Sequence, residues 1–487
     1  MSITLKQNLM PADENALSAQ THLLFVLSAD CPDTLPFLSV LNAKLTRTNK
    51  KYADLQKGAV VADLPNGALA SWVVLDEGLS AFKRQTQLRK AIKPLLDEKP
   101  AALAIAVYGS EGARQQAAKD AFYVVSVNAA ELPERKGKVA QKETKSEVLR
   151  EVSIFGWQDS TEFAEIQAMI AGNVLTRTLT MTPPNELNPT QYRTKIAELA
   201  KSKGWQYQEF DMQQLTQMGA GAFVAVGQGS DPQDAAIVHL TYSPNDAKKH
   251  IALVGKGICF DTGGHNLKPA KYMNGMHEDM NGSAVALGVL LAATKAKLPM
   301  KIDCWLAIAQ NHIGPLAYKQ NDVVTALNGT TIEIVHTDAE GRMVLADTLT
   351  LASREKPDWM VDFATLTGSM MSALGDRYSG VLGNHPALLC KAVGLGAAVG
   401  ERVCAFPFDD DYDEDIESSI ADIKQCTLDG GADHVHATRF LSKFIEHDVP
   451  WLHVDLSSYN RKGGLGAVAS DVNGFGVALT FELLKQY

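Results

Sequence analysis

Five near-continuous apolar runs constrain the fold of this chain more than any other feature. They are AAIVHLTY (235–242), HIALVG (250–255), KIDCWLAIA (301–309), DWMVDFATL (358–366) and WLHVDL (451–456). Runs without polar alternation are typical of strands that are covered on both faces. Long helical stretches lie between them, over residues 282–297, 342–355 and 434–447. This alternation of strand and helix predicts an α/β fold with a mostly parallel, twisted sheet flanked by helices.

The N-terminal part has shorter runs of the same kind: HLLFVLSA, GAVVADL, ASWVVLD, AALAIAVYG and AFYVVSV. They alternate with helix-permitting stretches such as residues 78–99, which predicts a small α/β domain. Because 487 residues exceed one ordinary core, we predict two domains, over residues 1–160 and 161–487. The pattern of residues 161–181 fits a connecting helix that the prolines of PPNELNP end, and the Lys- and Glu-rich segment 131–151 reads as an exposed loop.

Composition and charge exclude several classes of protein. With 46% hydrophobic and 21% charged residues, the chain is globular rather than disordered, and no apolar run is long enough to cross a membrane. Residues 1–150 hold 20 Lys and Arg against 16 Asp and Glu, and the remainder holds 26 against 40. The acidic C-terminal part argues against nucleic-acid binding and is compatible with a site for cations. Six scattered cysteines without a C-x-x-C pair, and no secretory signal, lead us to expect a cytoplasmic protein.

Polar residues follow three of the expected strands, where open α/β sheets place their chemistry. Lys256, Asp261, Lys268 and Asp279 follow HIALVG, while Asp338, Glu340 and Arg342 follow TIEIVH, and the turn TLTGS follows WMVDFA. Four carboxylates brought together repel one another unless cations neutralise them. Divalent ions with oxygen ligands, such as Mg²⁺, Mn²⁺ or Zn²⁺, would do so, and two of them would form a hydrolytic centre.

Structural explanations for each segment remain open when the segments are considered separately. Thr337 and Glu340 fit a capping box, DTGG is more often a turn than a site, and a lysine between two glycines is usually solvated. Capping does not explain why three separate segments deliver the same chemistry to strand ends. The conjunction favours a metal site.

The motifs themselves resemble a known family. HTDAEGRMVLADTL resembles the Asn-Thr-Asp-Ala-Glu-Gly-Arg signature of the leucyl aminopeptidase (cytosol aminopeptidase) family of two-metal exopeptidases. VGKGICFDTGGHNLKP and MHEDMNGSAVALG resemble its other metal-binding segments, and TMTPPNELNPTQY, ATLTGS and GGADHVHATRFLSKF match in order and spacing. The resemblance covers roughly residues 160–487. The N-terminal part matches only in size and α/β character.

The resemblance implies a role for each matching residue. The metal ligands would be Lys256, Asp261, Asp279, Asp338 and Glu340, with Asp261 and Glu340 bridging two divalent ions per subunit (Mn or Zn, with Mg as a further option). Lys268 and Arg342 would be catalytic groups that do not bind metal, and Arg342 would hold a bicarbonate. Met276, Thr365 and Gly368 would contact the substrate.

The activity that the resemblance implies is a metal-dependent aminopeptidase. It would release N-terminal amino acids, leucine-like ones preferred, from peptides by attack of a metal-bridging hydroxide. Residues 161–487 would be the catalytic domain of a homohexamer, with residues 1–160 serving assembly or access. Several positions depart from the family pattern, among them His336, Asn281 and His265, and none of them is a ligand. A two-metal phosphoesterase and a non-catalytic DNA-binding relative are the alternative interpretations.

Overall fold

The computed structural model describes residues 3–30, 32, 34–137, 148–230 and 233–486, and it divides into two compact units. The first unit comprises Met1–Ile170, Ala397–Gly400 and Lys462–Asn473, and the second comprises Ala171–Gly396, Glu401–Arg461 and Gly474–Tyr487. The connecting helix is present as α5 (Ser160–Thr180). The units divide within this helix rather than at residue 160, because its first turns bury Phe163 and Ile166 in the core of the first unit.

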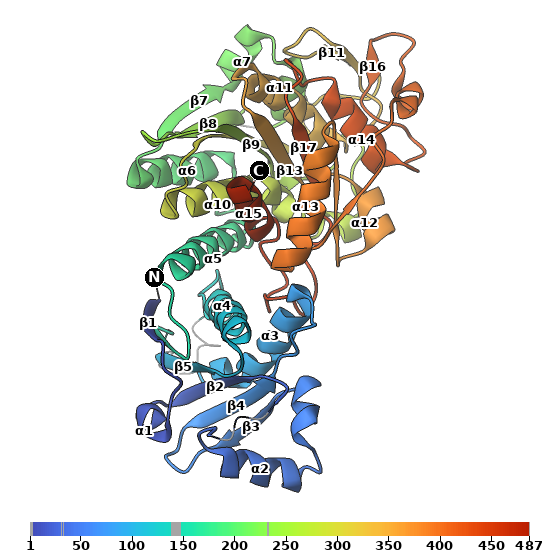
Figure 1. The fold of residues 1–487 in the computed structure, drawn as a ribbon. Helices are drawn as coiled ribbons and strands as arrows, with labels where there is room; N and C mark the ends of the chain where they lie inside the picture. The colour runs from blue at the N-terminus through green and yellow to red at the C-terminus, as the bar shows by residue number, and fades with distance from the viewer. Residues whose placement is uncertain (1–2, 31, 33, 138–147, 231–232, 487) are drawn as a thin grey trace. The chain divides into compact units, whose positions relative to one another are not determined.

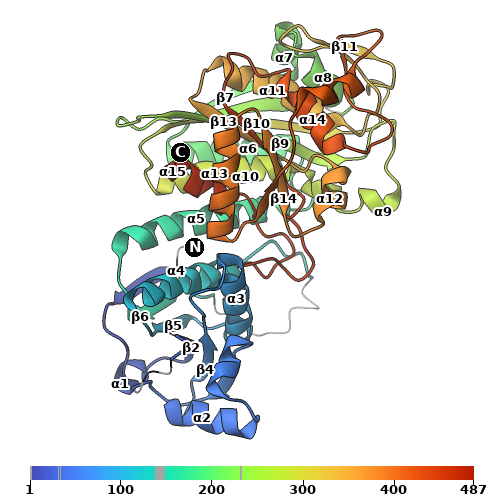
Figure 2. The same ribbon diagram turned by 45° about the vertical axis from the view of Figure 1, so that its right-hand side comes forward.

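The first unit is built on a six-stranded sheet with the order β1-β6-β5-β2-β4-β3. All neighbours are parallel except β3 and β4. Its strands are β1 (Thr4–Asn8), β2 (His22–Leu27), β3 (Val60–Asp63), β4 (Leu69–Val74), β5 (Ala102–Val107) and β6 (Glu151–Phe155). Its helices are α1 (Glu14–Leu17), α2 (Leu38–Arg47), η1 (Tyr52–Gln56), α3 (Ala81–Asp97) and α4 (Glu111–Asn128). Helices α3 and α4 cover one face of the sheet and α2 covers the other (Figure 2).

One expectation for this unit was wrong. The run AFYVVSV, which reads as a strand, forms the last turns of helix α4. A short apolar run cannot distinguish a strand from a helix that is buried on most of its surface. The residues Ala121, Phe122, Val124 and Val125 are all fully buried, so the run carries no polar face that would reveal a helix. The predicted loop 131–151 lies partly outside the described residues, and Glu151 begins β6.

The second unit is built on an eight-stranded sheet with the order β15-β14-β17-β13-β9-β10-β8-β7 (Figure 1). The predicted runs form its middle, as β8 (Ala236–Tyr242), β9 (His250–Asp261), β10 (Lys301–Asn311), β13 (Trp359–Ala364) and β17 (Trp451–Asp455). Neighbours among β17, β13, β9 and β10 are parallel, whereas β8 and β14 join them antiparallel. The α/β fold class and the mostly parallel sheet are therefore confirmed.

The predicted helices of the second unit are α10 (Asn281–Lys295), α11 (Glu340–Arg354) and α14 (Asp433–Ser442). The other helical elements are α6 (Pro189–Lys203), α7 (Met212–Met218), α8 (Gly221–Gly227), α9 (Ala270–Met273), η2 (Met276–Met280), α12 (Gly368–Leu374), α13 (Pro386–Val399), η3 (Asp410–Ile416) and α15 (Val477–Gln486). The other strands are β7 (Gln206–Asp211), β11 (Val323–Thr325), β12 (Thr331–Glu333), β14 (Ser379–Gly383), β15 (Val403–Ala405) and β16 (Ile423–Lys424).

Alternate residues of β9 serve opposite faces of this sheet, as the pleat requires. Ala252 and Val254 belong to the core cluster that also holds the apolar side chains of α11. Gly255 faces α10, where a Cβ would lie only 2.5 Å from the Cα of Ser283. The glycine therefore allows α10 to pack directly against the strand that ends at Asp261.

The segment that leads to Asp338 does not join the main sheet. TIEIVH supplies β12, which pairs with β11 and β16 in a separate three-stranded sheet. The expectation of three strand ends in one sheet is thus corrected to two, β9 and β13, with the loop before α11 as the third contributor. The run is too short and its burial too uneven for a central strand, since Thr331 and Glu333 are only half-buried.

The cysteines of the described residues are all free: Cys259, Cys304, Cys390, Cys404 and Cys426. Cys31 lies outside the described residues. Within the described parts of the chain, every helix is too short or too polar to span a membrane.

Candidate functional site

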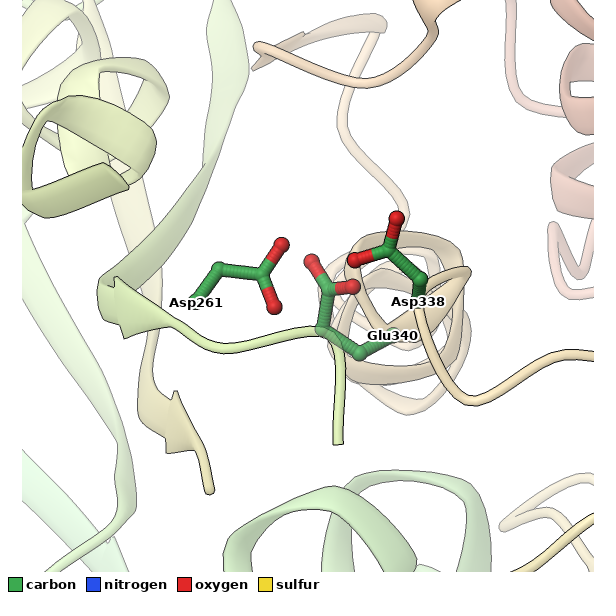
Figure 3. A group of neighbouring side chains, drawn as sticks. All are labelled: Asp261, Asp338 and Glu340. Atoms are coloured by element: carbon green, nitrogen blue, oxygen red, sulfur yellow. The ribbon is translucent and has the colours of Figure 1, made fainter. Parts of the chain in front are cut away.

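Three carboxylates converge at the carboxyl end of β9. Asp261 is the last residue of that strand, Asp338 lies in the loop before α11, and Glu340 is the first residue of α11 (Figure 3). One oxygen from each lies within 4.8 Å of the other two. Asp261 and Glu340 are 2% and 1% exposed, which means that their charges are held almost entirely out of water. Such a cluster requires cations nearby.

Two lysines lie between the carboxylates. The Nζ of Lys268 is 2.9 Å from Asp261 Oδ2 and 2.5 Å from Asp338 Oδ1. The Nζ of Lys256 is 2.8 Å from Asp279 Oδ2 and 2.9 Å from Glu340 Oε1. The structure therefore brings together six of the predicted residues, from β9, the loop after it, η2, the loop before α11 and the first residue of α11: Lys256, Asp261, Lys268, Asp279, Asp338 and Glu340.

A glycine of the signature segment makes room for Lys256. A Cβ at Gly341 would lie 2.6 Å from both Cε and Nζ of Lys256. The lysine side chain thus crosses directly over the first turn of α11 to reach Glu340. Any larger residue at position 341 would collide with the Lys256 side chain. The contact between Lys256 and Glu340 therefore requires the glycine.

Burial raises the pKa values of three carboxylates at this site, those of Asp279, Asp338 and Glu340. Burial, followed by the charges of Asp261 and Glu340, raises the pKa of Asp338 to about 7. Burial also raises the pKa of Asp279 to about 8, although the charge of Lys256 opposes the shift. The pKa of Glu340 is raised by burial and by Asp261. These carboxylates are poor anions unless more positive charge is brought to them.

The pKa values of the two lysines are raised as well, but by the charges of the carboxylates and not by burial. Burial by itself would lower the pKa of Lys256 and of Lys268, but the surrounding carboxylates raise both pKa values above the ordinary range. Both side chains are therefore ammonium ions at neutral pH when nothing else neutralises the cluster.

Asn311 is a member of the site that sequence reasoning missed. It ends β10 beside Asp261, and its Nδ2 donates to Asp261 Oδ1 at 2.8 Å and to the carbonyl of Thr337 at 3.0 Å. One amide thus orients Asp261 and fixes the signature loop. The sequence offered a signal, because Asn311 is one of the two polar residues, Gln310 and Asn311, that follow the predicted strand KIDCWLAIA.

The residues predicted to contact substrate lie on the adjoining turns. Thr365 follows β13, donates from Oγ1 to Asp279 Oδ1 at 2.7 Å, and accepts at its carbonyl from Lys256 Nζ at 3.1 Å. Met276 begins η2, the turn that carries Asp279, and Gly368 begins α12. Thr365 therefore contacts Asp279 and Lys256 directly, whereas Met276 and Gly368 lie on neighbouring turns.

Arg342 is turned towards helix α14. Its Nη2 lies 2.8 Å from both carboxylate oxygens of Asp433, and its Nη1 donates to the carbonyl of Gln425 at 3.0 Å. The side chain is 2% exposed. Sequence reasoning expected the guanidinium to be aimed at a reacting group and did not identify Asp433, since no spacing rule links these two distant segments.

Three departures from the family pattern occupy different environments. His336 accepts at Nδ1 from the amide of Asp338 at 3.3 Å, and burial, followed by the charge of Lys268, lowers its pKa. Asn281 is fully buried and donates to Thr180 Oγ1 at 3.0 Å. His265 is exposed, but its neighbour Asn266 accepts from the amide of Thr337 at 2.8 Å.

A comparison with protein families gives the observation that decides the identity of this fold and site. The model of the cytosol aminopeptidase family, catalytic domain, matches residues 174–481. The chain belongs to the cytosol aminopeptidase family. The resemblance carried by the motifs is thereby confirmed, and the match covers most of the second unit.

Curated relatives in the cytosol aminopeptidase family align over part of their length. A probable cytosol aminopeptidase of Corynebacterium glutamicum is 38% identical over 332 residues, which cover 68% of this chain and 66% of the relative. Another, of Chlorobaculum tepidum, is 37% identical over 363 residues, covering 72% of this chain and 71% of the relative. The alignments thus span about two thirds of these relatives.

Solved structures extend the likeness to nearly the whole chain. The bottromycin maturation enzyme BotP in complex with Mn has a TM-score of 0.81 at 27% identity, covering 96% of this chain and 99% of its own. A mutant of tomato leucine aminopeptidase has a TM-score of 0.83 at 23% identity, covering 100% and 97%. The second likeness is one of fold alone, and both include the N-terminal part that the motifs did not reach.

Proposed function

We propose that this member of the cytosol aminopeptidase family is a metal-dependent aminopeptidase that releases N-terminal amino acids from peptides. The observation that carries the proposal is the buried cluster of Asp261, Asp338 and Glu340, whose ligand oxygens lie within 4.8 Å of one another. The cluster is formed by the motif positions at which the family resemblance implies metal ligands.

The donor set fits two divalent cations. Asp279 Oδ2 and Asp338 Oδ1 are buried and contact ammonium groups, but neither accepts a well-aligned hydrogen bond from the described residues. These oxygens have acceptor capacity left, and hard cations prefer carboxylate oxygens. Lys256, Asp261, Asp279, Asp338 and Glu340 would hold the ions. Mn²⁺ or Zn²⁺ is our first expectation, with Mg²⁺ as a further candidate, and the similar structure of BotP was solved in complex with Mn.

Lys256 would have to change its protonation state to join them. A lysine can ligate a metal only as the neutral amine, whereas the carboxylates raise its pKa in the protein alone. Metal binding would therefore release this proton, and metal affinity should increase with pH.

The bound ions, Lys268 and Asn311 would each have a separate role in the reaction. When bound, the two ions would supply the positive charge that makes a water nucleophilic near neutral pH. Lys268, kept charged by its carboxylate neighbours, would donate a hydrogen bond to the oxygen of the scissile carbonyl as negative charge develops on it. Asn311 would hold Asp261 in one orientation throughout, through the 2.8 Å hydrogen bond described above.

Substrate choice follows from the same arrangement. The free α-amine of a peptide would be recognised beside the carboxylates, which restricts cleavage to the N-terminal residue. Met276, Thr365 and Gly368 would line the pocket for that residue, and we propose a leucine-like preference because Met276 is apolar and one structure with this fold is a leucine aminopeptidase. We further propose a cytoplasmic homohexamer in which the N-terminal unit serves assembly or access.

The decisive assay is hydrolysis of a leucine anilide by metal-stripped protein, before and after addition of Mn²⁺ or Zn²⁺. An N-acetylated leucine anilide is the matched control, and phosphate monoesters and diesters test the competing two-metal phosphoesterase. The proposal requires cleavage of the free-amine substrate alone, and only with metal. Equal cleavage of the acetylated substrate, or cleavage of phosphoesters instead, would overturn it.

A further inference from the structure

Arg342 and Asp433 form an ion pair beside this site that the proposed chemistry does not use. Both oxygens of Asp433 lie 2.8 Å from Arg342 Nη2, and the arginine is 2% exposed. The carboxylate side chain is 21% exposed, so it closes the guanidinium off from the solvent side. Charge-assisted contacts between a guanidinium and a carboxylate are strong and geometrically specific.

One of the three guanidinium nitrogens is left without an acceptor within the described part of the chain. Nη1 donates to the Gln425 carbonyl and Nη2 to Asp433, whereas Nε finds no acceptor among the described residues. Nε and Nη2 form one edge of the guanidinium plane, the edge that pairs side-on with a planar oxyanion. Asp433 occupies half of this edge. It also neutralises the charge, so the pair offers a second anion little net attraction.

The position of Asp433 is fixed by the neighbouring structure. It is the first residue of α14, and the next residue, His434, donates its backbone N–H to Ser369 Oγ at 2.9 Å. The ring Nδ1 of His434 also lies 2.9 Å from that oxygen. Ser369 belongs to α12, whose capping residue Thr367 donates to Asp455 Oδ2 at 2.6 Å. The carboxylate is thus held by two helices and a strand rather than by a mobile loop.

We propose that Asp433 is a positioning residue that supplies, from within the chain, the carboxylate partner of Arg342, so that hydrolysis proceeds without a small oxyanion from solution. The inference rests on the proposed aminopeptidase function. It replaces our expectation of a bicarbonate at Arg342 with an internal group. Asp433 acts on the reaction by holding Arg342, which directly follows Glu340 and Gly341 on α11.

The substitution Asp433→Ala removes the carboxylate partner of Arg342. Nε and Nη2 would both lack an acceptor, in a buried position shaped for a planar anion. Bicarbonate or formate should then bind where the carboxylate was. Asp433→Asn is the matched control, because its amide fills the same space, removes the charge and leaves no room for an added anion.

The first test measures binding without catalysis. Metal-stripped wild-type protein, Asp433→Ala and Asp433→Asn are titrated calorimetrically with sodium bicarbonate and sodium formate, against sodium chloride at equal ionic strength. We expect saturable binding to Asp433→Ala alone. Saturable binding of bicarbonate to the wild-type protein would overturn the proposal, because Arg342 would then accept an anion while paired.

The second test measures turnover of leucine anilide in carbon-dioxide-depleted buffer with metal present. Wild-type turnover should not respond to bicarbonate, whereas Asp433→Ala should lose about 10- to 100-fold and recover saturably when bicarbonate or formate is added. Asp433→Asn should show the loss without the recovery. Asp413→Ala, which removes the partner of Arg439 on the same helix, should leave turnover and its bicarbonate response unchanged.

Failure of this inference is distinguishable from failure of the proposed function. A wild-type protein that hydrolyses the anilide but is stimulated by bicarbonate refutes only the role of Asp433, as does full turnover of Asp433→Ala without added anion. A wild-type protein that never hydrolyses the anilide refutes the proposed function. If Asp433→Ala does not fold, the wild-type titration and the Asp433→Asn variant still decide the question.

Discussion

Replacing Lys256 by methionine tests how far the buried carboxylates of the site depend on the lysine ammonium group. Methionine keeps most of the apolar length of the side chain and removes the ammonium group. In the metal-free protein, Asp279 and Glu340 then lose the cation that lies 2.8 and 2.9 Å away. Lys256 is 3% exposed, which leaves water little access to compensate. The substitution therefore leaves both buried carboxylates without their ammonium partner.

The expected cost follows from that burial. Removing one partner of a buried ion pair destabilises a protein by about 3–5 kcal/mol, because the remaining charge is uncompensated. Lys319→Met is the matched control on the surface. Lys319 pairs with Asp322 at 3.3 Å, but its side chain is 65% exposed. Exposed pairs contribute about 0–1 kcal/mol, so the two lysines should differ by several kcal/mol in the free energy of unfolding.

The measurement is urea unfolding of metal-stripped protein at neutral pH, followed by tryptophan fluorescence. Trp305, Trp359 and Trp451 are buried on the strands of the second unit and report its unfolding. The free energy is obtained from the midpoint and slope of that transition. A Lys256→Met variant that unfolds with the same free energy as Lys319→Met would refute the reasoning, since the carboxylates would then not depend on the ammonium group.

Three further predictions address the proposed mechanism and the fold. Glu340→Ala should abolish leucine anilide hydrolysis and weaken metal binding in a calorimetric titration, and unchanged turnover would contradict the two-metal assignment. Lys268→Ala should retain its metals and lose turnover by a factor of about 10² to 10³, whereas loss of metal would reverse the roles of the two lysines. Burial raises the pKa of Glu401 from 4.5 to about 7 despite hydrogen bonds from the amides of Leu479 and Gly476. The stability that the protonated Glu401 side chain contributes is therefore complete below pH 4.5 and lost as the pH rises through 7. Glu401→Gln should remove about 3 kcal/mol from the pH dependence of the free energy of unfolding, measured at both ends of this range. An unchanged pH dependence would exclude Glu401 as its source.

The sequence predicted the strands of the second unit because their composition reflects their position. HIALVG and DWMVDFATL are apolar on both faces, as central parallel strands must be, and they form β9 and β13. The same rule failed for AFYVVSV, where complete burial removes the polar face that marks a helix. It also failed for TIEIVH, whose few apolar residues cover a small separate sheet.

Within the site, the local sequence was enough to predict some of the functional residues but not all of them. The carboxylates could be found because they follow strands and occupy motif positions. Asn311 could have been found by the same rule, since it ends β10. The pairing of Arg342 with Asp433 could not, because it depends on how α11 and α14 pack, and that packing is decided by apolar side chains such as Phe440 and Val344 in a shared core. Long-range contacts of this kind leave no periodic trace in a sequence.

The central claim is that the carboxylate cluster holds two divalent ions. The most direct measurement is an anomalous difference map, recorded at the manganese absorption edge, from crystals of metal-stripped protein soaked in Mn²⁺. We predict two peaks among the side chains of Lys256, Asp261, Asp279, Asp338 and Glu340. A single peak, or manganese bound elsewhere while this cluster stays without density, would contradict the account.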